Sequence, residues 1–177
     1  MMLIFMALQA APLAEMKSSM HPVSVEESVA IFNRICFAKF PDAKAAKGII
    51  ADPALELTKL PETPSQAMQP GDAWTSPKAQ VSYVDADWMP MDMGSPQCSV
   101  TVVIEGQPLH STIAGAMTTS LQLPLVKFGK DAASAQSKWD IPQPNGDKWR
   151  MFLSTSQTPS GTEMRTVIMN LRGKKKK

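Results

Sequence analysis

The chain has 177 residues, of which 44% are hydrophobic and 19% are charged, a composition typical of globular proteins and not of disordered ones. This length suits one domain with a single core. Residues 174–177 are four lysines, and the rest of the chain has 14 basic against 16 acidic residues. A nucleic-acid-binding domain concentrates positive charge on its folded body, so we do not expect a nucleic acid as the partner.

The first 14 residues resemble a secretory signal peptide. An apolar run is followed by small residues at Ala11 and Ala14, although no Lys or Arg precedes the run. The run is shorter than the ~20 residues that span a bilayer, and we expect no transmembrane segment. We therefore predict a signal peptide over residues 1–14, one domain over residues 15–173 and a basic tail over residues 174–177. The expected location is the periplasm or the exterior of the cell.

The chain has two cysteines, Cys36 and Cys98. In an exported protein an isolated pair predicts one disulfide. Redox pairs and thiolate metal sites usually have the close C-x-x-C spacing, which is absent here. The predicted role of the bond is therefore structural.

Two helices are predicted before the proline-rich segment. Ser24 and Glu27 form a capping box, and apolar residues at helical spacing then indicate a helix over residues 25–39. Asp42 can cap a second short helix that ends at Gly48. Cys36 lies on the apolar side of the first helix.

Residues 52–77 contain five prolines, which remove backbone donors and predict a loop with at most a short strand at Trp74. Two strands are predicted next, over residues 81–85 and 97–104. In the second of these, alternation of apolar and polar residues places Cys98 on the inward side.

The last third of the chain predicts one helix and two strands. Apolar residues at helical spacing indicate a helix over residues 110–122. A loop is expected to run through Trp139 as far as Gly146. Strands are predicted over residues 149–157 and 163–172, joined by a hairpin turn.

The order of these elements predicts an α+β domain. We expect an antiparallel sheet of four to five strands, two to three helices packed on one face, and one helix-to-strand disulfide.

A methionine-rich run is the sharpest local pattern. Met89, Met91 and Met93 alternate and would share one side of an extended segment, and thioethers are soft ligands suited to Cu(I). The run is similar to the methionine-rich motifs of periplasmic copper-handling proteins, and His110 would complete such a site. The alternative is a buried or partner-facing loop, because the chain has 13 methionines and methionine often fills irregular cores.

Tryptophans near prolines suggest a second kind of site. Trp74, Trp88 and Trp139 would form a binding platform if their rings are exposed. The alternative is that they anchor loops or fill the core.

No catalytic signature is present. The chain has two histidines, no G-x-S-x-G nucleophile motif and no glycine-rich phosphate loop. We therefore predict a small exported protein that binds a protein or envelope partner without catalysis and needs no cofactor. The alternatives are a periplasmic Cu(I)-binding protein and a hydrolase whose residues converge only in three dimensions.

Overall fold

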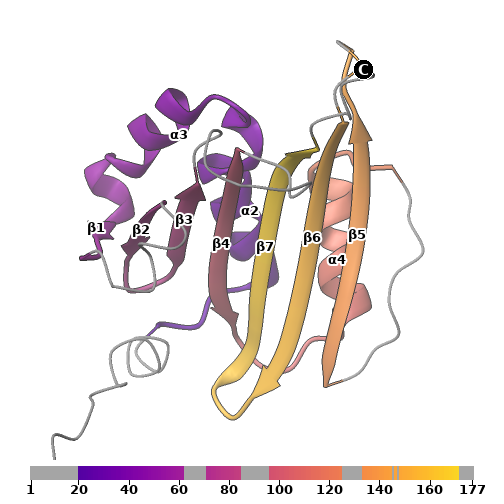
Figure 1. The fold of residues 1–177 in the computed structure, drawn as a ribbon. Helices are drawn as coiled ribbons and strands as arrows, with labels where there is room; N and C mark the ends of the chain where they lie inside the picture. Colours follow the sequence, from indigo (N-terminus) through magenta and orange to yellow (C-terminus); the bar gives the residue numbers. More distant parts are fainter. Residues whose placement is uncertain are drawn as a thin grey trace, which may run out of the picture.

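A computed structural model of the chain describes residues 20–61, 71–84, 96–124, 133–144, 146 and 148–171. These residues form one seven-stranded antiparallel sheet and three α-helices (Figure 1). The helices are α2 (Val25–Ile35), α3 (Ala43–Ile50) and α4 (His110–Ser120), with short 3-10 helices η1 (Phe37–Lys39) and η2 (Pro53–Leu55). The strands are β1 (Thr58–Lys59), β2 (Asp72–Thr75), β3 (Gln80–Val84), β4 (Gln97–Ile104), β5 (Ser134–Pro142), β6 (Lys148–Thr158) and β7 (Gly161–Leu171). Their order across the sheet is β1-β2-β3-β4-β7-β6-β5.

The α+β prediction is confirmed, but the sheet is larger than the four to five strands expected. The short strand that the sequence allowed at Trp74 is present as β2, and one extra strand, β1, also lies within the proline-rich segment; neither strand contains a proline. The other extra strand is β5, and the loop predicted through Trp139 was wrong. Pro142 is the last residue of this edge strand, a position where a missing backbone donor is tolerated.

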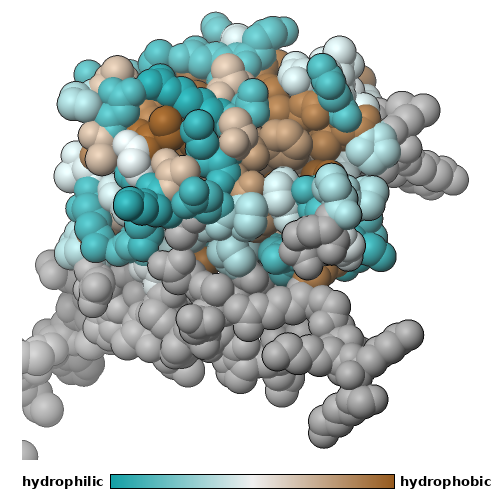
Figure 2. Space-filling model, turned by 90° about the horizontal axis from the view of Figure 1, so that it is seen from above, coloured by the Kyte–Doolittle hydropathy of each residue, from teal (hydrophilic) through white to brown (hydrophobic). Residues whose placement is uncertain are grey.

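The main core lies on the face of the sheet that the helices cover (Figure 1). Along β4 the alternate residues Cys98, Val100, Val102 and Ile104 are buried in the main core, as the sequence predicts. Figure 1 shows α2 and α4 behind the sheet, on the side of this core. Seen from above, hydrophobic residues reach the surface at one end of the molecule and hydrophilic residues surround them (Figure 2).

The helix starts follow the predicted capping residues. The Ser24 hydroxyl accepts a hydrogen bond from the Glu27 backbone N–H at 3.1 Å, and the Asp42 carboxylate accepts one from the Ala45 N–H at 3.0 Å. Helix α2 ends at Ile35 and not at residue 39 as predicted, because the chain tightens into the 3-10 helix η1. None of the helices in the described ranges has the length and hydropathy to cross a bilayer.

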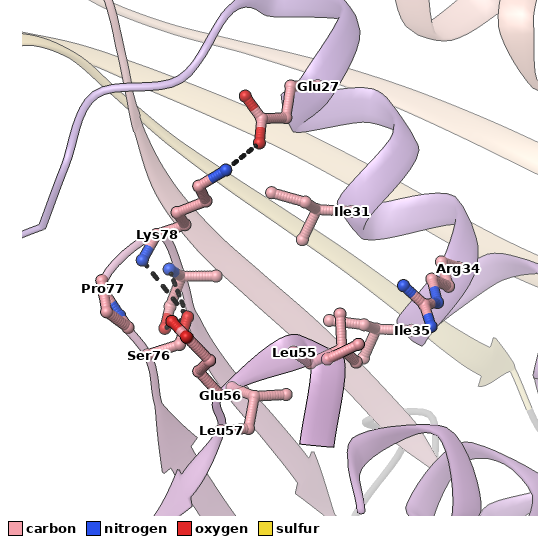
Figure 3. A pocket seen from close by; sticks show the side chains of 12 residues that line it. Glu27, Ile31, Arg34, Ile35, Leu55, Glu56, Leu57, Ser76, Pro77 and Lys78 are labelled. Atoms are coloured by element: carbon pink, nitrogen blue, oxygen red, sulfur yellow. Dashed lines mark hydrogen bonds and ion pairs between the residues drawn. The ribbon is translucent and has the colours of Figure 1, made fainter. Parts of the chain in front are cut away.

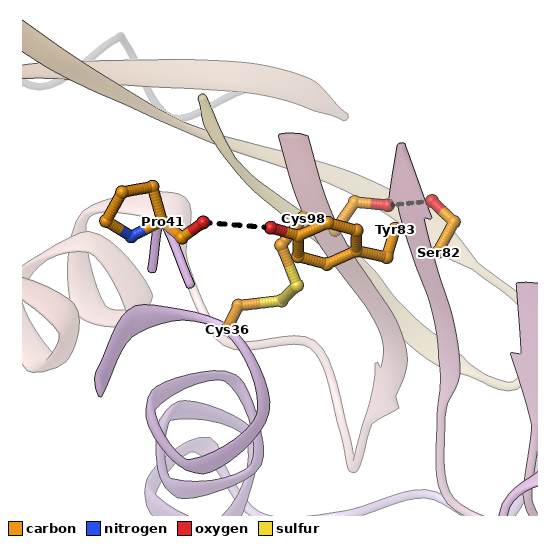
Figure 4. Close-up of a disulfide and its surroundings, with 6 residues drawn as sticks. Cys36, Pro41, Ser82, Tyr83 and Cys98 are labelled. Carbon is orange, nitrogen blue, oxygen red and sulfur yellow. Dashed lines mark hydrogen bonds between the residues drawn. A yellow bond between two sulfur atoms is a disulfide. The ribbon is translucent and has the colours of Figure 1, made fainter. Parts of the chain in front are cut away.

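The predicted disulfide is present. Cys36, at the end of α2, bonds to Cys98 on β4, and both residues are fully buried (Figure 4). Beside the bond, the Tyr83 hydroxyl donates to the Pro41 carbonyl at 3.2 Å, which holds the segment after α2 against β3. The disulfide therefore joins the helical layer to the centre of the sheet.

Candidate functional site

A pocket with a volume of about 500 Å³ lies between α2, the segment from η2 to β1, and the β2–β3 turn (Figure 3). Ligand pockets in proteins usually measure about 300–1,000 Å³. The lining residues are Glu27, Ile31, Arg34 and Ile35 of α2, residues 54–57 and residues 76–79. We call this site the α2 pocket.

One side of α2 forms the first wall. Glu27, Ile31 and Ile35 follow one another at intervals of four residues, which places them above one another on the helix. Ile35 is buried and Ile31 is half-buried. The helix therefore presents an aliphatic surface to the pocket, with a carboxylate at its first turn.

The second wall comes from η2 and the residues that follow it. Asp52 caps η2 by accepting a hydrogen bond from the Ala54 N–H at 2.9 Å. Glu56 then adopts a left-handed conformation with φ of 51°, which ends η2 and turns the chain toward β1. Leu55 and Leu57, on either side of this residue, are half-buried, and Figure 3 shows Leu55 across the pocket from Ile31.

The third wall is the β2–β3 turn. The Ser76 hydroxyl accepts hydrogen bonds from the backbone N–H groups of Lys78 and Ala79, at 3.2 and 3.1 Å. These bonds fix the turn and leave the Lys78 side chain projecting toward α2. Ser76 therefore has a structural role at the pocket.

Ion pairs lie at both ends of the α2 pocket. Lys78 Nζ lies 2.7 Å from Glu27 Oε1, and this hydrogen bond raises the pKa of Lys78. At the other end, Arg34 pairs with Asp52, which lies just outside the lining. The pocket thus combines an aliphatic interior with charged groups at its rim, an arrangement suited to binding an amphipathic ligand.

His110, at the start of α4, is buried on the same face of the sheet as α2, toward the edge formed by β6 and β5. Its Nδ1 is 2.8 Å from the Thr155 hydroxyl of β6, and its Nε2 is 2.8 Å from the Ser137 hydroxyl of β5. Both ring nitrogens are thus engaged by hydroxyl groups. These contacts hold the first turn of α4 against the sheet.

The copper hypothesis stays a prediction. Met89, Met91 and Met93 lie outside the described residues, whereas His110 is described and buried. Within the described ranges, no three His, Cys, Asp or Glu side chains converge closely enough to hold a metal ion.

The predicted tryptophan sites occupy different environments. Trp139 is fully buried on β5, so its ring is not available at the surface. Trp74 is half-buried and packs against the core, whereas Trp88 lies outside the described residues. Since Trp139 is a core residue, a surface platform would have to form without it.

The sequence analysis did not identify the α2 pocket. Its residues come from α2 and from two stretches near the two ends of the proline-rich segment. No local motif links these three parts of the chain. The only sequence signal was the pair Ile31 and Ile35 beside Arg34 on one helix, which is also what an ordinary buried helix contains. Comparisons of the chain with known protein families, curated proteins and solved structures found no match.

Proposed function

We propose that this is a small exported protein that binds an amphipathic ligand in the α2 pocket and does not catalyse a reaction. The observation that carries this proposal is the pocket itself, with its volume of about 500 Å³, its aliphatic interior and its ion-paired rim. Export is supported by the buried Cys36–Cys98 disulfide, because such bonds persist mainly in oxidising compartments.

Three of the four charged residues that line the pocket are in ion pairs, and the fourth, Glu56, is exposed. Glu27 is paired with Lys78, and Arg34 with Asp52. The Ser76 hydroxyl is held by two backbone N–H groups of its own turn. A catalytic carboxylate or nucleophile lies beside a group that shifts its pKa toward the value that its reaction needs. The structural pairing of the groups in this pocket therefore favours binding over hydrolysis.

The pocket favours a ligand with an aliphatic or aromatic body and a charged group. Ile31, Leu55 and Leu57 are half-buried and would become fully buried beneath such a body. Lys78 and Arg34 are the cations of the rim, and an acidic group on the ligand would compete with Glu27 for Lys78 or with Asp52 for Arg34.

The experiment uses 1-anilino-8-naphthalenesulfonate, a fluorescent probe with an aromatic body and one sulfonate. We expect saturable binding of one equivalent by the folded protein. In Ala54→Trp the indole would fill the pocket, because Ala54 is an exposed lining residue of η2, and the affinity should fall about tenfold or more, corresponding to ~1.4 kcal/mol.

The matched control is Ala38→Trp. Ala38 is also an exposed alanine in a 3-10 helix, but it does not line the α2 pocket. Its variant should bind the probe as the parent protein does. Equal affinity in all three proteins, or no saturable binding, would show that the pocket is not a ligand site.

A further inference from the structure

The sheet consists of two similarly ordered halves. In chain order, α2 precedes β2, β3 and β4, and α4 precedes β5, β6 and β7. Strands β4 and β7 pair at the centre, so β2 and β5 hold equivalent positions on the two sides (Figure 1). On the first side β1 pairs with β2 and becomes the edge strand. On the second side β5 is itself the edge, and no described strand pairs with its outer side.

The hydrogen-bond pattern identifies the backbone groups that β5 leaves for a further strand. The Gln157 N–H of β6 donates to the Ala133 carbonyl at 2.8 Å, and the pairing continues without a bulge from Ser134 to Pro142. Hydrogen-bonded and non-hydrogen-bonded residues alternate along an antiparallel strand. The odd-numbered residues of β5 therefore bond to β6, whereas the N–H and C=O groups of its even-numbered residues point outward.

The even-numbered residues of β5 also carry exposed side chains on the face away from the core. They are Ser134, Gln136, Lys138, Asp140 and Pro142, and the residues between them are buried or half-buried. A strand of nine residues with an unpaired outer edge is a template for pairing with another strand. The side chains of the added strand must then match those of β5.

The charges of β5 are complementary to those of a second copy of β5. In a symmetric antiparallel pair, a two-fold axis passes through the middle of the two strands. With the axis at Trp139, Lys138 of each copy lies opposite Asp140 of the other copy. An axis at Lys138 or at Asp140 would place two like charges opposite one another, which is destabilising. The charges therefore favour the register that is centred on Trp139.

The same register matches the backbone groups. Lys138 and Asp140 both have outward N–H and C=O groups, so each of their two pairs would exchange two backbone hydrogen bonds. Gln136 would lie opposite Pro142 and donate to its carbonyl, and only the missing N–H of Pro142 leaves an acceptor without a donor. The ladder would thus extend over most of the strand.

The Asp140 carboxylate is prepared for this contact. It accepts two hydrogen bonds from Arg150 of β6, at 2.6 and 3.0 Å, and this contact is the main reason that its pKa is lowered. The carboxylate is therefore ionised at neutral pH. Because a carboxylate has about four lone-pair sites, it can accept from Arg150 and from a lysine of the second copy together.

We propose that two copies of this chain associate through their β5 edges into a dimer with one continuous antiparallel sheet. The two-fold axis passes through Trp139, and Lys138 of each copy pairs with Asp140 of the other. The α2 pocket is lined by α2, residues 54–57 and residues 76–79, which lie toward the opposite edge of the sheet. The dimer is therefore independent of ligand binding, and Ala54→Trp should leave it unchanged.

Sedimentation velocity of the full chain at several concentrations measures this association. We expect the parent protein to form a dimer that dissociates on dilution. Lys138→Asp and Asp140→Lys, made separately, each place like charges opposite one another at both symmetry-related pairs, so each dimer should be weaker by about tenfold or more. Mixing the two variants in equal amounts restores opposite charges at both pairs, and a heterodimer should form.

The matched control is Lys44→Asp, which makes the same change of charge at an exposed residue of α3. This variant should dimerise as the parent protein does. In addition, Gln136→Pro removes an outward N–H and leaves the hydrogen bonds between β5 and β6 in place, so it should weaken the dimer without a change of sign in any charge. Circular dichroism of each variant confirms that the fold is kept.

Hydrogen exchange gives a second readout at the level of single residues. The N–H groups of Gln136, Lys138 and Asp140 should be protected in the dimer and should exchange quickly once dilution has separated the copies. The N–H group of Trp139, which bonds to β6, should stay protected in both states.

Four results would overturn the proposal. One is a monomer at every concentration, and another is a dimer that neither charge reversal nor Gln136→Pro weakens. A mixture of Lys138→Asp and Asp140→Lys that associates no better than either variant alone would show that the register is wrong. Protection of the outward N–H groups in a monomer would mean that another segment of the same chain covers the edge of β5.

Discussion

At the scale of single residues, the structure depends most visibly on Gly161, the first residue of β7. Its φ is 139°, a conformation that L side chains rarely adopt, and a Cβ built there would lie within 2.3 Å of the Ile104 carbonyl oxygen. The backbone of Gly161, at the β6–β7 hairpin, therefore lies very close to the backbone of Ile104, at the end of β4. Only glycine allows this approach.

We predict that Gly161→Ala destabilises the protein by about 2 kcal/mol or more, because it combines backbone strain with a steric clash. Gly115→Ala is the control. Gly115 lies within α4 with nothing near its Cβ position, so this variant should be more stable by about 0.5–1 kcal/mol. Urea unfolding midpoints measure both changes, and equal stability of the two variants would contradict the prediction.

At the scale of elements, one carboxylate links three of them. Asp72 on β2 accepts from Lys59 Nζ of β1 at 2.6 Å and lies 3.2 Å from Lys47 Nζ of α3. The hydrogen bond from Lys59 is the main reason that the pKa of Asp72 is lowered. Strand β1 is only two residues long and pairs with β2 alone, so the ion pairs of Asp72 help to hold this edge of the sheet.

We predict that Asp72→Asn lowers the free energy of unfolding at neutral pH by about 1 kcal/mol or less, as for other partly exposed ion pairs. The folded-state pKa lies below the unfolded value of about 3.9, so the contribution is complete above that pH and is lost as pH falls through the folded pKa. Parent and variant should therefore converge in stability in acid. Urea unfolding of both proteins from neutral to acid pH tests this convergence.

The control for Asp72→Asn is Glu105→Gln, which alters an exposed carboxylate after the end of β4. At neutral pH its free energy of unfolding should be close to that of the parent. A gap for Asp72→Asn that stays constant between neutral and acid pH would mean that the ion pairs do not stabilise the edge.

Strands β4 and β5 show when a sequence pattern is sufficient to predict a strand and when it is not. The β4 strand was predicted with its bounds and its inward side, because apolar residues alternate with polar ones over most of its length, although Ser99, Thr101 and Val103 on its other side are buried as well. In contrast, β5 was predicted as a loop. Its inward residues include Ser137, and prolines at its end obscured the alternation, yet Ser137 is buried because it bonds to His110.

At the scale of the whole molecule, the disulfide is the covalent link between the helices and the sheet. Cys36 and Cys98 are separated by 62 positions and are both fully buried. Closing a loop of this length restricts the unfolded chain far more than it changes the folded one.

We predict that Cys36→Ala with Cys98→Ala lowers the free energy of unfolding by about 4 kcal/mol, a large part of a typical total of about 5–15 kcal/mol. The double variant avoids a free thiol, and guanidinium unfolding measures the loss. A change below about 1 kcal/mol would show that the packing around Tyr83 and Pro41 holds the two layers without the bond.

The sequence by itself determined the capped helices, the inward side of β4 and the pairing of the two cysteines. Each of these depends on short-range periodicity, on a capping residue or on the number of cysteines in the chain. All three can be found in the sequence without knowing which segments pack together. Only the tertiary structure decided the number of strands and the α2 pocket. The pocket joins Ile31, Leu55 and Lys78 through packing between distant segments. Such contacts depend on which surfaces are buried together, and no local pattern encodes them.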